Sequence, residues 1–253
     1  MNKDVQKINS LSRGLKILDI IHENGKIGVT ELSKQLGVNK SSAYRLLVTL
    51  EDSGYVEQIA ENGKYTLGLK LCKFQEKLLN TYDIRTISHP FLEELTSVTG
   101  ESSGLSIRKN DKIMLIDCLN STQHLGVILQ VGDTEDFHCT AHAKALLYTL
   151  PEEEQRRLLS AEPLTRHTPH TLTSVDEVIA QSAINKERGY ALDDEENTLG
   201  MRCVATNIYD FHGNAIASIG LSGPKHRISK EKMEEYVALV QKIGKQISQK
   251  LGY

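Results

Sequence analysis

The N-terminal quarter of the chain shows two short helical patterns of hydrophobic residues, joined by a tight turn. Thr30 is a good N-cap for the first helix, and Gly37 would end it, because a left-handed C-terminal position suits glycine. Asn39 can cap the second helix. The apolar positions recur at helical spacing and are Leu32, Leu36, Val38, Ala43, Leu46, Leu47 and Leu50. The segment therefore predicts a helix-turn-helix.

A β-hairpin is predicted directly after the second helix. Residues 55–59 and 65–67 read as strands, and residues 61–63 between them include an Asn-Gly pair suited to positive φ angles. A hairpin in this place is the wing of a winged helix-turn-helix. Before the motif, apolar residues predict the first helix of a three-helix core, and these are Leu15, Ile17, Leu18, Ile20 and Ile21.

The pattern changes near Gly68, where we expect a boundary. Residues 69–82 predict a linker helix with an apolar stripe formed by Leu69, Leu71, Phe74, Leu78 and Leu79. Pairing with the same helix of a second subunit would cover this stripe, and packing on its own domain is the alternative. A new helix over residues 84–99 should begin after Asp83.

From Gly100 onward the pattern mixes strands and helices. Strands are predicted over residues 103–108, 112–119, 125–131, 201–210 and 214–222. Helices are predicted over residues 141–150, 151–159, 174–189 and 230–250. Ser174 and Glu177 have the spacing of a capping box. Strand hairpins with flanking helices indicate an α+β fold, with helices on the faces of an antiparallel sheet. We expect a winged helix-turn-helix in residues 1–67, a linker helix in 68–82 and an α+β domain in 83–253.

Composition restricts the class of protein. The chain has 253 residues, a formal net charge of −3 and 39% hydrophobic residues, which are typical of a soluble globular protein. No apolar run approaches the ~20 residues that span a bilayer, and the polar N-terminus lacks the apolar core of a secretion signal. Four irregularly spaced cysteines favour reduced thiols in the cytoplasm, and these are Cys72, Cys118, Cys139 and Cys203.

The predicted recognition helix has an exposed face that could read DNA in the major groove. Residues 1–66 carry nine Lys or Arg and eight Asp or Glu, so a monomer would bind phosphates weakly. Dimerisation would double the contacts, and we therefore predict a dimeric, site-specific DNA binder. The candidate DNA-binding residues, with Lys64 at the wing tip, are Thr30, Asn39, Lys40, Ser41, Ser42, Tyr44, Arg45 and Lys64.

The chain resembles the IclR family of bacterial transcriptional regulators from end to end. The resemblance rests on VTELSKQLGVNKSSAYRLLVTLEDSGYV and SRGLKILDII near the N-terminus and on HCTAHAKALL in the second domain. Its most specific part is RGYALDDEENTLGMRCVATNIYDFHGNAIASIGLSGPKHRIS. The resemblance implies a winged-helix reader, a linker helix and a GAF-like domain that binds a small effector. It also implies a dimer or a dimer of dimers (a homotetramer), and control, with repression favoured, of a carbon-source catabolic operon.

The resemblance also implies an effector pocket, since relatives that bind small organic acids do so between the first helix of the sheet domain and the last strands. The corresponding residues here are Ala141, His142, Asp193, Cys203, Gly220 and Ser222. Relatives often have a small residue in place of His142 and a serine in place of Gly220. An anionic effector is still expected, because helix amides near Ala141 would face it.

Other interpretations remain open at this stage. Cys203 could be an ordinary core residue, and Asp193 could belong to a solvated acidic loop. A thiol-dependent enzyme could use Cys203 with His142 as the base, and a zinc ion could bind these two residues with His138 and Cys139. A protein-interaction scaffold is the third hypothesis. We expect no cofactor, no metal and no catalytic residue.

Overall fold

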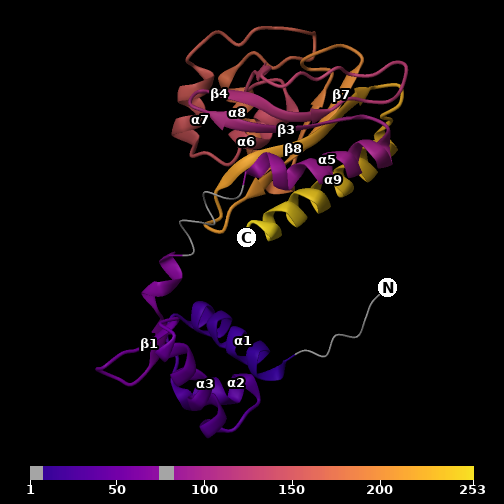
Figure 1. Cartoon of the computed structure of the whole chain (residues 1–253). Coiled ribbons are helices and arrows are strands. Elements are labelled where there is room, and N and C mark those ends of the chain that lie inside the picture. Colours follow the sequence, from indigo (N-terminus) through magenta and orange to yellow (C-terminus); the bar gives the residue numbers. More distant parts are fainter. Residues whose placement is uncertain (1–7, 74–82) are drawn as a thin grey trace. The chain divides into compact units, whose positions relative to one another are not determined.

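The computed structural model describes residues 8–73 and 83–253, and the chain divides into two compact units, residues 1–82 and 83–253 (Figure 1). The N-terminal unit contains α1 (Asn9–Asn24), α2 (Val29–Leu36), α3 (Lys40–Asp52), β1 (Val56–Gln58), β2 (Tyr65–Leu67) and the 3₁₀ turn η1 (Leu69–Leu71). Strands β1 and β2 pair antiparallel, which confirms the predicted wing. None of the described helices is long and apolar enough to cross a membrane.

The core of the N-terminal unit joins the three helices to the wing. Its fully buried side chains are Ile17, Ile21, Ile27, Leu32, Leu47, Val56 and Tyr65. The prediction that Leu15 belongs to this core is wrong, because its side chain is 56% exposed. Leu15 lies two residues before Ile17, about 200° around the helix, and so points away from the core.

The predicted start of α2 is also wrong, since Thr30 lies inside the helix and Gly28 occupies the N-cap position. The start of α2 is set by a contact with strand β2 of the wing. The backbone of Ile27 exchanges hydrogen bonds of 3.0 and 2.8 Å with Tyr65, which fixes the end of the extended segment and lets the helix begin at Val29. At the other end, Gly37 has a φ of +64°, as its predicted C-cap role requires. The predicted linker helix lies mostly in residues 74–82, outside the described residues.

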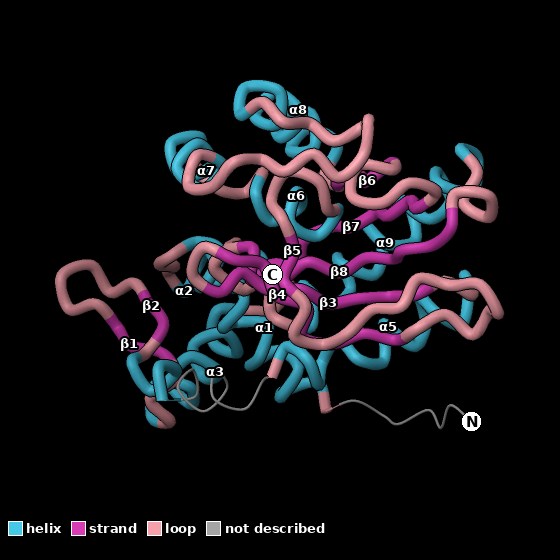
Figure 2. The backbone as a smooth tube through the Cα atoms, turned by 90° about the horizontal axis from the view of Figure 1, so that it is seen from above, coloured by secondary structure: helices cyan, strands magenta, loops and turns pink. Residues whose placement is uncertain are grey.

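The C-terminal unit is a six-stranded antiparallel sheet in the order β5-β4-β3-β8-β7-β6. Its strands are β3 (Ser102–Lys109), β4 (Lys112–Leu119), β5 (Thr134–Glu135), β6 (Ala191–Asp194), β7 (Met201–Tyr209) and β8 (Ala215–Pro224). Its helices are α5 (Ile84–Thr99), α6 (Ala141–Leu147), α7 (Glu152–Leu159), α8 (Val175–Arg188) and α9 (Lys230–Lys250). Helices α5 and α9 cover one face, and α6, α7 and α8 lie on the other (Figure 2). This arrangement confirms the predicted α+β fold.

Alternation along β7 and β8 decides which residues meet which helix. In β8, Ile219 and Leu221 enter the core formed with α5 and α9. The intervening positions of the strand face α6. Several of the side chains packed between α6 and the sheet are small, including Ala145, Cys203 and Ala205. Small residues allow α6 to lie close to the sheet, and its C-terminal half is held there by Asn207, whose side-chain amide donates to the carbonyl of Ala145 at 2.7 Å.

Several local predictions for this unit are wrong. Residues 125–131 form a loop, because Asn120 occupies both backbone groups of Leu129 with its own side chain, through bonds of 2.7 and 3.2 Å. The edge strand is β5 instead. Helix α6 ends at Leu147, before a turn that leads into Pro151. Ser174 stands at the N-cap of α8 but makes no side-chain capping bond.

Candidate functional site

The first candidate site is the exposed face of α3. As predicted, Asn39 caps this helix: its side-chain oxygen accepts the backbone N–H of Ser42 at 2.8 Å. The hydroxyl of Ser41 donates to the same oxygen at 2.9 Å. The cap fixes the first turn of α3, which is the end that a recognition helix presents to base edges.

The polar residues of α3 face solvent while its apolar residues face the core. Lys40, Tyr44 and Arg45 are exposed, whereas Ala43 and Leu47 are fully buried. Among the ion pairs between described residues, none uses Lys40 or Arg45. Both cations are therefore available to phosphates or to base edges.

The remaining DNA-binding candidates are less prominent. Ser42 is half-buried beneath the Asn39 cap. Lys64 is half-buried at the end of the wing loop, where its N–H donates to Asn62 at 3.0 Å, rather than at the tip. Thr30 is exposed on α2, and its carbonyl accepts the hydroxyl of Ser33.

The second candidate site is a cavity of about 300 Å³ beside the N-terminus of α6, which we call the α6 pocket. Five of the six predicted effector-binding residues line it, namely Ala141, His142, Asp193, Cys203 and Ser222. Thr140, in the loop that the resemblance places against the effector, also lines it. The sequence interpretation missed the rest of its wall, which comes from loop residues and strand ends. These residues are Leu115, Val127, Ile128, Leu129, Asp133, Thr134, Glu135, Asp136, Asn197, Thr198 and Met201.

Gly220 is the predicted pocket residue that does not line the cavity. A Cβ atom at this position would lie 2.3 Å from the carbonyl oxygen of Val204 and 2.9 Å from the Cβ of Ala205. Strands β7 and β8 therefore leave no room here for a side chain.

We expect Gly220→Ser to lower the free energy of unfolding by about 1–3 kcal/mol, because the added atoms would force the paired strands apart. Chemical denaturation of the full-length protein measures this change. Ser222→Ala, on the same strand, is the matched control and should change stability little. Equal stability of Gly220→Ser and the wild type would show that β7 and β8 can yield at this point.

His142 lies in the first turn of α6 and reaches across to the sheet. Its Nδ1 atom lies 3.0 Å from the hydroxyl oxygen of Ser218. A Cβ atom on Gly104 would lie 3.3 Å from its Nε2, so glycine at that position gives the imidazole its space. Gly104 and Gly220 are paired across β3 and β8. The bulky ring thus stands over strands that carry no side chain at these two positions.

Asp193 is not part of a solvated acidic loop, since it lies in β6 with 1% of its surface exposed. One of its carboxylate oxygens accepts the backbone N–H groups of Glu196 at 2.8 Å and Asn197 at 3.2 Å. Burial raises the pKa of Asp193 to about 6, although the Lys144 ammonium and these two N–H groups act in the opposite direction. Asp193 therefore positions the turn that carries Asn197 into the pocket wall.

The raised pKa of Asp193 predicts that the free energy of unfolding depends on pH. Between its ordinary pKa of 3.8 and about 6, Asp193 keeps in the folded state a proton that the unfolded chain releases. Stability should therefore fall by about 3 kcal/mol as the pH rises through this interval. Asp193→Asn keeps the acceptor oxygen without the charge, so its stability advantage over the wild type should grow from pH 4 to pH 7. Denaturation at several pH values measures the difference, and a constant difference would contradict the prediction.

Cys203 pairs with Ser222 across β7 and β8. Burial, followed by the charge of Asp193, raises the pKa of the Cys203 thiol well above its usual range. A protonated, buried thiol is a poor nucleophile. The partner of His142 is Ser218, so the geometry gives no support to the thiol-enzyme hypothesis.

The lining of the α6 pocket is rich in acceptors. The described residues that line it include four carboxylates, Asp133, Glu135, Asp136 and Asp193, and neither lysine nor arginine. Glu135 is already engaged, because it accepts hydroxyl groups from Ser106 at 2.6 Å and Thr140 at 3.0 Å. The hydrogen-bond donors of the lining are His142, Ser222, Thr198, Asn197 and the first backbone N–H groups of α6. One of these N–H groups, that of Ala143, already donates to the side chain of the N-cap residue Thr140.

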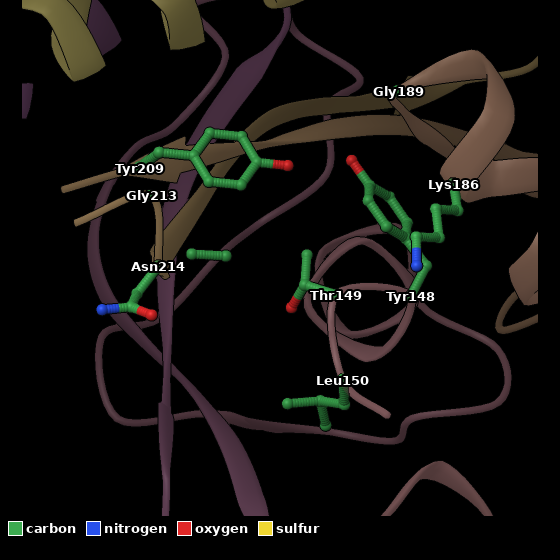
Figure 3. A pocket seen from close by; sticks show the side chains of 9 residues that line it. Tyr148, Thr149, Leu150, Lys186, Gly189, Tyr209, Gly213 and Asn214 are labelled. Atoms are coloured by element: carbon green, nitrogen blue, oxygen red, sulfur yellow. The ribbon is translucent and has the colours of Figure 1, made fainter. Parts of the chain in front are cut away.

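A second cavity of about 390 Å³ lies at the other end of α6, near the β7–β8 turn (Figure 3). The rings of Tyr148 and Tyr209 stand on opposite sides of it, with Lys186 and Asn214 at its edge. Burial raises the pKa of the Tyr148 hydroxyl, which is therefore protonated at neutral pH. None of the predicted effector-binding residues lines this cavity.

Comparison with family models covers both units. Residues 10–60 match the IclR helix-turn-helix domain, and residues 76–249 match the model of the bacterial transcriptional regulator IclR C-terminal domain. The chain belongs to the IclR family. The resemblance read from the sequence is thereby confirmed.

Individual relatives agree over nearly the whole chain. The KdgR regulator of Dickeya chrysanthemi is 33% identical over 253 residues, which are 100% of this chain and 83% of the relative. The acetate operon repressor of Salmonella typhimurium is 34% identical over 249 residues, covering 97% of this chain and 91% of the relative. The crystal structure of the Agobacterium tumefaciens repressor BlcR superposes with a TM-score of 0.85, at 26% identity and with coverage of 98% and 99%. This IclR-family protein is a DNA-binding transcriptional regulator and not an enzyme.

Proposed function

We propose that the protein is a cytoplasmic repressor of a catabolic operon, released from its operator when a small hydroxylated organic acid binds the α6 pocket. In this proposal residues 1–67 bind DNA, 68–82 link the two units and 83–253 bind the effector. The observation that carries it is the joint presence of a capped, cation-bearing α3 and a pocket lined by five predicted effector residues. A catabolic target is supported by a relative that is named as the acetate operon repressor.

The DNA contacts are assigned by exposure and charge. Lys40, Tyr44 and Arg45 would reach base edges from α3, and Ser41, Ser42 and Asn39 would contact phosphates at its N-terminal end. Lys64 of the wing and Thr30 of α2 would meet the flanking backbone.

A homodimer is supported by an apolar stripe along α1 and its N-cap residue, Ile8. Ile8, Leu11 and Leu15 follow one another at helical spacing and are 67%, 59% and 56% exposed. A stripe of this kind needs a partner, and a second copy would cover it symmetrically. Pairing also doubles the number of phosphate contacts that the nearly neutral N-terminal unit can make. A dimer of dimers would place two such pairs on one operator.

The chemistry of the effector follows from the lining of the α6 pocket. His142, Ser222 and the N–H groups that begin α6 can donate to a carboxylate. The carboxylates of Asp133 and Asp136 would repel an unsubstituted anion but can accept hydroxyl groups. A molecule with a carboxylate at one end and hydroxyl groups along its length satisfies both sets.

Three six-carbon compounds test this assignment by isothermal titration. Gluconate has a carboxylate and hydroxyl groups, hexanoate has the carboxylate alone, and sorbitol has hydroxyl groups alone. We expect gluconate to bind more tightly than the other two, and His142→Ala to weaken it by about tenfold or more. His226→Ala, an exposed histidine away from the pocket, should bind as the wild type does. Tighter binding of hexanoate or sorbitol would overturn the assignment.

A further inference from the structure

Three metal-ligand side chains gather beside the α6 pocket. His138 and Cys139 immediately precede the Thr140 cap of α6 and are buried, whereas His167 lies in the segment between α7 and α8. One donor atom from each lies within 4.8 Å of the other two. None of the three is among the residues that line the α6 pocket. The zinc hypothesis from the sequence groups His138 and Cys139 with His142 and Cys203, but His142 and Cys203 line the α6 pocket, and His167 is the third residue beside His138 and Cys139.

Hydrogen bonds fix the same tautomer on both imidazoles. The Nε2 atom of His138 lies 2.9 Å from the carbonyl oxygen of Thr165, and that of His167 lies 3.1 Å from a carboxylate oxygen of Asp136. Both acceptors lack a proton, so each Nε2 donates, and in the neutral imidazole Nδ1 is then the nitrogen that carries the lone pair. Metal-binding histidines have this arrangement, in which the second nitrogen donates to a carbonyl or a carboxylate.

The surroundings of Cys139 favour a cation. The thiol is fully buried, and the negative charges of Asp136 and Asp193 act on it. Its sulfur lies 3.8 Å from the side-chain oxygen of Asn197. A metal that binds the Cys139 sulfur would displace the thiol proton to solvent. His167 retains 31% side-chain exposure and leaves a path from solvent.

We infer that His138, Cys139 and His167 bind one Zn²⁺ ion through two imidazole nitrogens and a thiolate. This donor set suits zinc, whose tetrahedral ligands lie about 3.5 Å apart. The three donors would therefore draw together by about 1 Å on binding. A water molecule would complete the tetrahedron.

The ion would connect the segment between α7 and α8, which carries His167, to the start of α6. That segment already contacts the residues next to the pocket wall, because the hydroxyls of Thr168 and Thr171 donate to the carbonyls of Glu195 and Glu196 at 2.6 and 2.5 Å. Zinc would thus connect two sides of the α6 pocket without touching the effector. The site stands independently of the identity of the effector.

Titration of the metal-free, full-length protein with Co²⁺ tests the site directly. Cobalt occupies tetrahedral zinc sites, and a Co²⁺–thiolate bond gives a charge-transfer band in the near ultraviolet. We expect one equivalent per chain with this band, displaced by Zn²⁺. Cys139→Ser should abolish the band, and His167→Ala, a change on the surface, should weaken cobalt binding by at least about tenfold.

His170→Ala is the matched control, because His170 is exposed three residues away in the same segment and should bind cobalt as the wild type does. Absence of stoichiometric cobalt binding by the wild type would overturn the inference. So would a charge-transfer band that survives Cys139→Ser, or a wild-type affinity in His167→Ala. Circular dichroism of each variant identifies any loss of binding that comes from unfolding, and His167→Ala decides the matter if Cys139→Ser fails to fold.

Discussion

Arg45→Ala is expected to weaken binding to the operator by about 30-fold or more. Arg45 is exposed on α3, and no ion pair between described residues holds its guanidinium. A lost arginine contact to a base edge costs about 1–3 kcal/mol, and a dimer loses two of them. Fragments of genomic DNA selected on the purified protein supply the site, and fluorescence anisotropy across a salt series measures the affinity.

Lys16→Ala is the control for this experiment, because it removes one exposed cation from α1 of the same unit and leaves α3 intact. It should retain most of the affinity and all of the sequence preference. Equal binding by Arg45→Ala and the wild type would contradict the assignment of α3 as the recognition helix. It would favour the scaffold hypothesis, in which the winged helix contacts protein.

Lys144→Met is expected to destabilise the C-terminal unit by about 3–5 kcal/mol, because it leaves a largely buried carboxylate without its partner. The Lys144 ammonium lies 2.6 Å from both carboxylate oxygens of Glu196, and the two side chains are 3% and 16% exposed. For a unit of this size the loss corresponds to a fall in melting temperature on the order of 10 °C. Differential scanning calorimetry measures it.

The double variant Lys144→Met/Glu196→Gln removes the unpaired charge and should recover a large part of the loss. Arg156→Ala breaks two exposed ion pairs, with Glu152 and Asp176, and should have little effect. A loss in Lys144→Met no larger than that of Arg156→Ala would show that Glu196 is well solvated. It would also remove the reason to regard the 193–196 segment as a fixed wall of the pocket.

The sequence was a good guide where a local signal coincided with the tertiary structure. The Asn39 cap, the Gly37 turn and the wing are local features, and all three form as predicted. Thr30 failed as a cap because a long-range pairing, between Ile27 and Tyr65, decides where α2 begins. The 125–131 segment failed as a strand because one side chain, Asn120, satisfies its backbone in place of a neighbouring strand.

The α6 pocket was partly predictable for the same reason. Cys203 and Ser222 followed from the family resemblance, and strand pairing brings them together. The loop residues of the wall, such as Asp133 and Asn197, carry no periodic signal that would place them near α6. Gly220 shows the opposite failure, since its position on the strand was right but the approach of Val204 leaves it no access to the cavity.

The central claim is that one small molecule controls the affinity of this protein for its operator. The most direct test is the dissociation constant of the wild type for the selected operator, measured with and without saturating gluconate or whichever compound of the panel binds. We predict a weakening of at least about fivefold, and an equal weakening of effector binding when operator is present, as linkage requires. An effector that binds the α6 pocket while leaving the operator affinity unchanged would contradict the account.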